Sequence, residues 1–346
     1  FSLATSLEKK LALKLKQHIP SAEQVRFSKN GSDVTTAAIR LARFLTKRER
    51  IVVCGYHGWH DWFISSTSMN RGIPNQVQRL THTIKYNSTK DLEKIFSRYP
   101  EQVAAVIMEP ANYEKPKESY LNEVKKIIKK NKAILIFDEM CTGFRFSLGG
   151  AQSFFNVTPD LSCFGKSMGN GMPIAALVGK KKYMQHIDKI FFSGTFGGES
   201  LSLIAALAVI EKMEKEFVVD YLWKFGRNLK VKVNQLINKY KLNKFIKLKG
   251  YDPWILLNFL DYKNYTKFQL MTLFKSLMIK NGVLISNSHN ICFAHNKANL
   301  ETILNAYEMS FSKISEILRK GNLIKNLRNS RIITPVIQVR EQLQKE

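Results

Sequence analysis

The sequence predicts an α/β protein with a mostly parallel, doubly wound sheet in a large domain and a smaller α+β domain at the C-terminus. Between residues 31 and 166, short apolar runs alternate with charged stretches of helical length, which is the pattern of successive βα units. From about Lys224 the helical stretches become longer and more basic. We therefore expect a large domain over residues 1–223, a small domain over 224–321 and a peripheral tail over 322–346.

The composition is that of a globular protein with an unusual charge. Of 346 residues, 45% are hydrophobic, and 54 Lys and Arg against 28 Asp and Glu give a formal net charge of +26. The lysines are spread over many helical stretches, as at Lys125, Lys129 and 180–182, and no nucleic-acid motif accompanies them, so we expect no nucleic-acid partner. A bias toward Lys, Asn and Ile, or an acidic or phosphorylated substrate, would each account for the charge.

The same sequence predicts neither a membrane span nor a disulfide-rich protein. No apolar run approaches the roughly 18 residues that cross a bilayer. The cysteines at 54, 141, 163 and 292 lie far apart without paired spacing, so we expect no disulfide and no zinc site. A chain without a basic and apolar leader is expected to carry no signal peptide, and these features together predict a cytoplasmic location.

The first elements place a loop of small residues before a helix. An amphipathic helix is expected over residues 7–19, and residues 27–33 then lead into a second helix over 34–45. The unpaired N–H groups and positive dipole end at such a helix start suit a phosphate. Capping by Ser32 or Asp33 explains the same pattern without a ligand.

An aromatic loop follows the next expected strand, residues 51–54. It reads Gly-Tyr-His-Gly-Trp-His-Asp-Trp over residues 55–62. The loop suits either a packed surface corner or a binding site. A pair of histidines suggests a metal, but no further carboxylate or cysteine stands at ligand spacing from them, so we predict no metal site. A capped helix over 89–99 and a strand over 103–108 come next, and the strand ends in Glu109.

The stretch from residue 133 to 166 holds the strongest functional pattern. A basic helix over 120–130 leads into an apolar run over 133–137, which ends in Asp138 as a strand buried on both faces does. A second apolar run over 161–164 ends just before Lys166. Most lysines are solvated and acidic residues commonly end strands, but parallel strands bring both side chains to the carboxyl edge where such sheets bind ligands. A lysine that forms a Schiff base and a carboxylate that keeps a pyridine nitrogen protonated are parts of a pyridoxal phosphate site.

The remaining elements are a strand over 174–178, a loop over 191–199 and a long helix after it. Four short strands are expected in the small domain. They cover residues 245–248, 254–260, 283–285 and 291–293.

The central motif also resembles a known family. Residues 137–145 (Phe-Asp-Glu-Met-Cys-Thr-Gly-Phe-Arg), with 149–152 and 157–161, resemble class III pyridoxal phosphate-dependent aminotransferases, above all the branch that contains glutamate-1-semialdehyde aminomutase. The resemblance extends from about Glu8 to about Ala306. It implies the fold of type I pyridoxal phosphate-dependent transferases and a homodimer whose active sites straddle the interface. Family members usually carry a further N-terminal segment, so we expect one before this sequence.

The resemblance implies roles for individual residues. Lys166 is the Schiff-base lysine and then the acid/base that moves a proton, and Asp138 is the partner of the pyridine nitrogen. Glycine, asparagine and proline usually follow the family's phosphate-binding threonine, whereas this chain has Gly-Glu-Ser at 198–200. The other cofactor-binding candidates are Asn30, Gly31 and Ser32 at the phosphate, Tyr56 and Met140 at the ring, His57 and Glu109 near it, and Thr195, which reaches the phosphate of the neighbouring subunit.

These residues predict an aminotransferase that moves an amino group between an amine or amino acid donor and an aldehyde or keto acceptor. Glutamate-1-semialdehyde aminomutase is the alternative, and a non-catalytic basic binding protein is a third. We favour intermolecular transfer because an aminomutase needs a mobile lid. The segment 59–87, which is long and glycine-rich in aminomutases, holds only Gly72, and no acid precedes Ala294 and His295 as it does in those enzymes.

Overall fold

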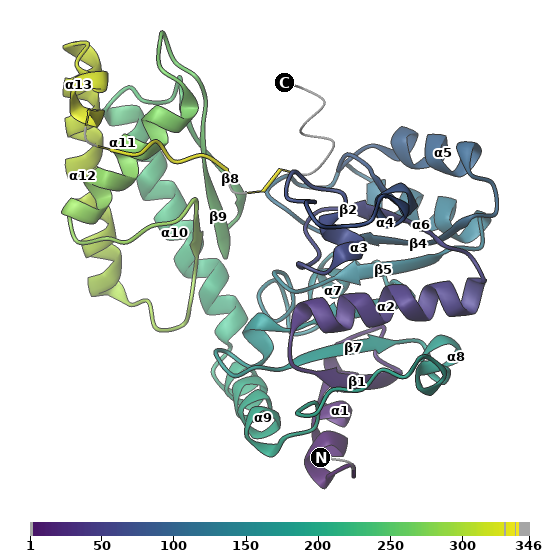
Figure 1. Ribbon diagram of the computed structural model, residues 1–346. Coiled ribbons are helices and arrows are strands. Elements are labelled where there is room, and N and C mark those ends of the chain that lie inside the picture. Colours follow the sequence, from purple (N-terminus) through teal and green to yellow (C-terminus); the bar gives the residue numbers. More distant parts are fainter. Residues whose placement is uncertain (1–2, 329, 336, 339–346) are drawn as a thin grey trace. The chain divides into compact units, whose positions relative to one another are not determined.

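The computed structural model describes residues 3–328, 330–335 and 337–338, which form two compact units. Unit 1 runs to Val219 and takes in Ile337 and Gln338, and unit 2 begins at Asp220. Both are drawn in Figure 1. Among the described residues, no helix is both long and apolar enough to cross a membrane.

Unit 1 is built on a seven-stranded sheet with the order β1-β7-β6-β5-β4-β2-β3. Strands β3, β2, β4, β5 and β6 pair in parallel, whereas β7 is antiparallel to both β6 and β1. This arrangement confirms the predicted mostly parallel sheet. The strands are β1 (Gln24–Ser28), β2 (Arg50–Cys54), β3 (Thr81–Thr83), β4 (Val103–Met108), β5 (Ile134–Asp138), β6 (Leu161–Phe164) and β7 (Ala175–Gly179).

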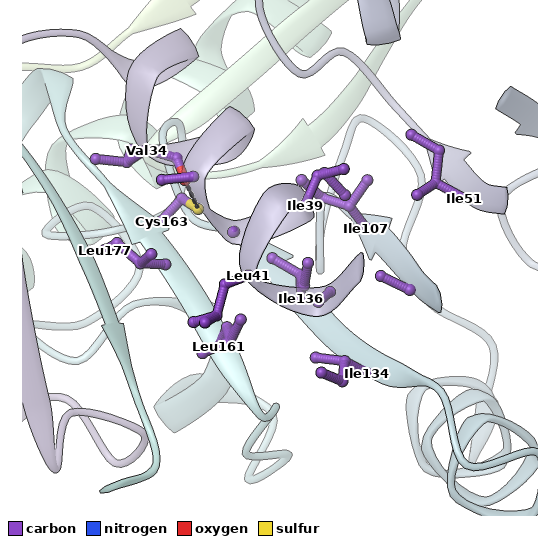
Figure 2. Packing of buried hydrophobic residues seen from close by; sticks show 14 of the residues in the cluster. Val34, Ile39, Leu41, Ile51, Ile107, Ile134, Ile136, Leu161, Cys163 and Leu177 are labelled. Atoms are coloured by element: carbon purple, nitrogen blue, oxygen red, sulfur yellow. Dashed lines mark hydrogen bonds between the residues drawn. The ribbon is translucent and has the colours of Figure 1, made fainter. Parts of the chain in front are cut away.

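Two apolar clusters cover the two faces of this sheet. Ile134 and Ile136 of β5 belong to the cluster under α2, which Figure 2 shows, while Leu135 and Phe137 belong to the cluster with α5 and α6. Because successive side chains of a strand point to opposite faces, a strand covered on both sides is apolar throughout. The helices of unit 1 are α1 (Ser6–His18), α2 (Gly31–Thr46), α3 (Asp61–Ile64), α4 (Asn75–Leu80), α5 (Thr89–Arg98), α6 (Tyr120–Lys130), α7 (Ala151–Phe154), α8 (Lys181–Met184) and α9 (Ser200–Lys215), with short 3₁₀ turns η1 (Lys166–Met168) and η2 (Ile187–Ile190).

Unit 2 combines helices with a small antiparallel sheet of order β10-β9-β8. Its strands are β8 (Ile246–Tyr251), β9 (Trp254–Phe259) and β10 (Ser288–Asn290). Its helices are α10 (Val218–Lys239), which begins just before the boundary, α11 (Lys267–Lys280), α12 (Lys297–Arg319) and α13 (Leu323–Leu327). Although α13 falls in the stretch expected to be a peripheral tail, Leu323 and Leu327 are buried and α13 packs against α11. The other expected tail residues described, 330–335 and 337–338, form no helix or strand, and the rest lie outside the described residues.

Two strands expected in unit 2 are wrong. Residues 283–285 and 291–293 form no strand, and Leu284 is 89% exposed after a turn at Gly282. The polar residues of β10 pair with β9 instead. A three-residue strand held by backbone hydrogen bonds has no apolar signature, so hydrophobic pattern alone misplaces it.

Candidate functional site

A cavity of about 450 Å³ lies in unit 1 at the carboxyl edge of the parallel strands. Its walls come from the start of α2 and from the residues that follow β2, β4, β5 and β6. The structure therefore brings together nearly all the candidates of the sequence analysis, because parallel strands end at one edge. These are Asn30, Gly31, Ser32, Tyr56, His57, Glu109, Asp138, Met140 and Lys166. Thr195 does not line this cavity and lies in an exposed turn.

Asp138 is the last residue of β5, and its buried carboxylate makes two polar contacts. Its Oδ1 accepts a hydrogen bond from the Met140 N–H at 3.1 Å, and its Oδ2 lies 2.9 Å from Nδ1 of His57. His57 is itself buried, and its Nε2 has no hydrogen-bond partner within the described chain. The two contacts set the orientation of the carboxylate in the cavity wall.

Lys166 follows β6 in a backbone conformation that is uncommon for a residue other than glycine, with φ of 44°. Its Nζ donates to Sγ of Cys141 at 3.1 Å. Burial acts to lower the pKa of Lys166, but Cys141 and the carboxylates of Asp138 and Glu109 outweigh it and hold that pKa above its ordinary value. Burial also raises the pKa of Cys141, while Lys166 opposes that shift.

Glu109 follows β4 and titrates near neutrality. Burial raises its pKa from 4.5 to about 7, with Asp138 adding to the shift and His57 and Lys166 opposing it. Gly55 has a φ of 115°, and a Cβ at that position would lie 2.4 Å from the Glu109 carboxylate. Only glycine therefore fits beside this side chain.

The start of α2 meets the aromatic loop at the other end of the cavity. The N–H groups of Gly31 and Ser32 lie in the first turn, where no helical carbonyl can accept from them. Thr35 donates through its hydroxyl to the His57 carbonyl at 3.0 Å. The N-cap of α2 is Asn30 rather than Ser32 or Asp33, and Asp33 contributes to a capping box by accepting from the Asn30 N–H at 3.0 Å. The N-terminus of α2 is therefore capped while the N–H groups of Gly31 and Ser32 have no helical acceptor.

Met140 and Tyr56 supply the apolar surfaces of the cavity. The sulfur of Met140 lies 3.0 Å from the place that a Cβ would take at Gly31 and 2.8 Å from the corresponding place at Gly165. Tyr56 is 47% exposed and packs edge-on against Phe63, with ring centroids 5.3 Å apart. A flat ring held between such surfaces would contact carbon and sulfur rather than polar groups.

Comparison with known proteins identifies the family. The model of the class III aminotransferases matches residues 2–320. The chain belongs to the class III aminotransferases. It is 35% identical to a 3-aminobutyryl-CoA aminotransferase of Cloacimonas acidaminovorans, over 92% of this chain and 78% of the relative. A glutamate-1-semialdehyde 2,1-aminomutase of Methanosphaera stadtmanae is 32% identical, over 91% and 80% of the two chains.

Solved structures agree on the fold of this class III aminotransferase. An omega-transaminase from Sphaerobacter thermophilus superposes with a TM-score of 0.82 at 22% identity, over 91% of this chain and 80% of the other. A structure titled as a transaminase with pyridoxal phosphate bound gives 0.84 at 20% identity, over 92% and 80%. The predicted family, type I fold, enzyme class and pyridoxal phosphate cofactor are therefore confirmed.

The cavity fits that cofactor. It presents an amine at Lys166, a buried carboxylate at Asp138 and a free helix start at Gly31, which match an aldehyde, a pyridine nitrogen and a phosphate. Gly31 lines the cavity and has no side chain, so its backbone faces the cavity directly, and a Cβ there would lie 3.0 Å from the Met140 sulfur.

Cys141, Lys29 and Glu139 also lie at or next to the site, although none of them was predicted from the sequence to have a role there. Cys141 stands within the quoted family motif, and only its contact with Lys166 distinguishes it from a core thiol. Glu139 is fully buried and accepts from the N–H groups of Ala151 and Gln152 at 2.8 Å each. Burial raises the pKa of Glu139 to about 6 while these bonds oppose the shift. Its carboxylate ties the loop after Asp138 to the start of α7.

Proposed function

We propose that this protein transfers an amino group from an amine or amino acid to a separate aldehyde or ketone, with Lys166 and Asp138 as its catalytic residues. The observation that carries the proposal is that the Lys166 amine, the Asp138 carboxylate and the start of α2 line one cavity of unit 1. Pyridoxal phosphate supplies an electron sink for the bond that breaks next to the transferred nitrogen.

The cofactor-binding set follows from the cavity. Gly31 and Ser32 donate their free N–H groups to the phosphate, and Asn30 holds the loop before them. Tyr56 and Met140, which line the cavity, would provide apolar contacts for the ring. Lys166 anchors the aldehyde end through its Nζ.

Each catalytic residue then has a task. Once the substrate amine has displaced it, the Lys166 amine would move a proton from the substrate carbon to the cofactor, and it would move a proton in the opposite direction when the acceptor is bound. Asp138 keeps a protonated pyridine nitrogen paired, and His57 with the Met140 N–H fixes the direction of its carboxylate. Glu109, with a pKa of about 7, would hold or release a proton near Lys166 close to neutral pH.

A second copy of the chain completes the site in our proposal. Thr195 lies in an exposed turn. Several large apolar side chains close to it in the sequence are exposed to solvent in the single chain. These are Phe191, Phe196, Leu201 and Ile204, each at least 50% exposed. A homodimer formed over this surface buries them and carries Thr195 to the phosphate of the partner's site.

The four cysteines are free thiols, which supports a cytoplasmic location.

Glutamate-1-semialdehyde aminomutase is the second candidate because several relatives carry that name. Two features of the chain support intermolecular transfer. Within the segment 59–87, Trp62 and Phe63 of α3 and the following Ser65 and Ser66 are buried, so this part is packed rather than free to open as a lid. The residues just before Ala294, 283–293, include no Asp or Glu, and Ser288–Asn290 form β10, which pairs with β9.

Half-reactions with the purified, cofactor-saturated protein test the proposal. A suitable amine should convert the cofactor absorbance to that of pyridoxamine phosphate, and a separate carbonyl compound should restore it. Borohydride reduction followed by peptide mapping should label Lys166. Lys166→Ala should abolish the conversion, whereas Lys90→Ala on the exposed side of α5 should leave it intact.

Two results would contradict the proposal. Amino transfer by Lys166→Ala at the wild-type rate, or label on another lysine, would remove Lys166 from its role. Rapid conversion of glutamate-1-semialdehyde to 5-aminolevulinate without added donor or acceptor would establish the aminomutase instead.

A further inference from the structure

A second cavity of about 570 Å³ lies at the opposite edge of the same sheet. It is lined by residues that precede β2, β5 and β6, which run parallel, and by residues that follow the antiparallel β7. Ile134 lines this cavity and Asp138, at the other end of β5, lines the cofactor cavity. At about 3.3 Å per residue the two lie about 13 Å apart along the strand. The second cavity is therefore separate from the cofactor site.

The wall of this cavity is strongly basic. Six cationic side chains and one carboxylate, that of Asp160, are among its lining residues. The cations are Arg48, Lys125, Lys129, Lys132, Lys180 and Lys182. The floor is apolar and includes the buried Ile128, Ala133, Ile134 and Leu135, with Tyr183 at the side.

Three of the cations already have a partner. Lys182 Nζ lies 4.6 Å from the centroid of the Tyr183 ring. Lys180 pairs with Asp160 at 2.8 Å, and Arg48 donates to the Asn131 carbonyl at the end of α6 at 2.7 Å. Asp160 also accepts from the Leu135 N–H at 3.1 Å. These contacts hold part of the rim and use the carboxylate.

The other lysines gather around a single lining carboxylate, Asp160, which is already paired with Lys180. Lys125, Lys129 and Lys132 are spaced to share one side of α6 and its C-terminal end, and none of them forms an ion pair within the described residues. Like charges at this spacing destabilise a helix. Burial and then Lys180 lower the pKa of Lys125, as expected where cations crowd together. Attraction to the C-terminal end of α6 explains Lys129 but not Lys125, which lies near the middle of the helix.

We propose that this cavity binds a small phosphate ester with three or more negative charges and an aromatic or apolar part, of the nucleoside triphosphate kind. A chain of phosphates matches the charge of Lys125, Lys129, Lys132 and Lys182, while the apolar floor and Tyr183 accommodate a flat ring. A single phosphate neutralises only part of this cluster, and the apolar floor favours a ligand that carries a ring over a bare nucleic-acid backbone. Such a site explains why these basic residues are present, since amino transfer in the cofactor cavity does not use them.

Calorimetric titration of the cofactor-saturated protein with ATP in 150 mM KCl tests this proposal. The expected result is saturable binding of one ATP per chain, with weaker binding of inorganic triphosphate and none of adenosine. Raising the KCl concentration should weaken ATP binding, because exposed charges are screened. Saturation with pyridoxal phosphate keeps the cofactor site out of the titration.

Matched double variants locate the site. Lys129→Gln with Lys132→Gln should weaken ATP binding at least ten-fold, which is about 1.4 kcal/mol. Lys90→Gln with Lys94→Gln, two exposed lysines of α5, changes the net charge equally and should leave ATP binding unchanged. Unaltered cofactor absorbance shows that each variant is folded. Absence of saturable binding, equal weakening in both doubles, or displacement of ATP by a short RNA at lower concentration than by triphosphate would each overturn the proposal.

Discussion

Replacing Glu109 with Gln removes a carboxyl group whose pKa burial raises from 4.5 to about 7. In the cofactor-free protein, the folded chain then binds this proton more tightly than the unfolded chain does. The stability that the group contributes is fully present below about pH 4.5 and is lost as the pH rises through 7. Glutamine keeps the size of the side chain and one acceptor oxygen but has no proton to release.

The magnitude follows from the raised pKa. A change from 4.5 to about 7 corresponds to about 3 kcal/mol, of which about 2 to 3 kcal/mol is lost between pH 5 and pH 8. The free energy of unfolding of Glu109→Gln, measured relative to the wild type, should therefore rise by that amount over this interval. The free energy of unfolding of the variant rises relative to that of the wild type because unfolded wild-type chains release the Glu109 proton at a lower pH than folded chains do.

Urea unfolding of the cofactor-free proteins at pH 5, 6, 7 and 8, followed by tryptophan fluorescence, measures this difference. Glu93→Gln, an exposed acid of α5, is the matched control and should give a difference that does not change with pH. A flat difference for Glu109→Gln would refute the reasoning. A difference of opposite sign would show that Glu109 is ionised and paired with Lys166.

Three further predictions concern the same site. Asp138→Asn should keep most cofactor binding and lose most of kcat, because the helix start still holds the phosphate while the pyridine nitrogen loses its charged partner; near-full kcat would reduce Asp138 to the end of a strand. A mixed dimer of Lys166→Ala and Thr195→Ala chains should retain one working site, as active-site titration would show, because both defects fall in the other site; an active monomer would contradict this. Glu139→Ala should lower the free energy of unfolding by about 3 kcal/mol, because it leaves two buried N–H groups without acceptors, and a loss below about 1 kcal/mol in urea unfolding would mean that water replaces the carboxylate.

The parallel core was predictable because burial on both faces leaves a clear pattern. All six residues of β4 and all five of β5 are buried, and each strand stands out as an unbroken apolar run. The antiparallel strand β1 was missed, since all of its residues except Ser28 are at least partly exposed, so it has no apolar run. Its pairing with β7 is a long-range contact that no local pattern announces.

The site was predictable in its members and less so in their contacts. Asp138, Glu109 and Lys166 each follow a strand, so the strand-end rule places them at one edge. The contact of Lys166 with Cys141 depends on the left-handed backbone at Lys166, which sequence does not reveal. The position of Thr195 relative to a phosphate stays a prediction, because a second chain is needed to test it.

The Gly-Glu-Ser stretch at 198–200, where the family usually has Gly-Asn-Pro, has a physical counterpart in the structure. Glu199 caps α9 by accepting from the N–H groups of Leu201 and Ser202, and its Oε1 lies 2.6 Å from Nζ of Lys29. Burial acts to raise the pKa of Glu199, but Lys29 and the N–H groups bring it down to about 2. The ion pair thus joins the residue before Asn30 to the segment after Thr195.

A double-mutant cycle with Lys29→Met and Glu199→Gln isolates this pair from the cap, which glutamine largely preserves. Both side chains are less than one-fifth exposed, so the coupling should reach about 1 kcal/mol, the upper end for pairs near the surface. Because the pKa of Glu199 is lowered, the coupling should be full at pH 7 and decline as the pH falls below about 4.5 toward 2. Urea unfolding at pH 7 and pH 3 measures it. Zero coupling at pH 7 would mean that Glu199 only caps α9 and that the two segments proposed to hold the phosphate are stabilised independently.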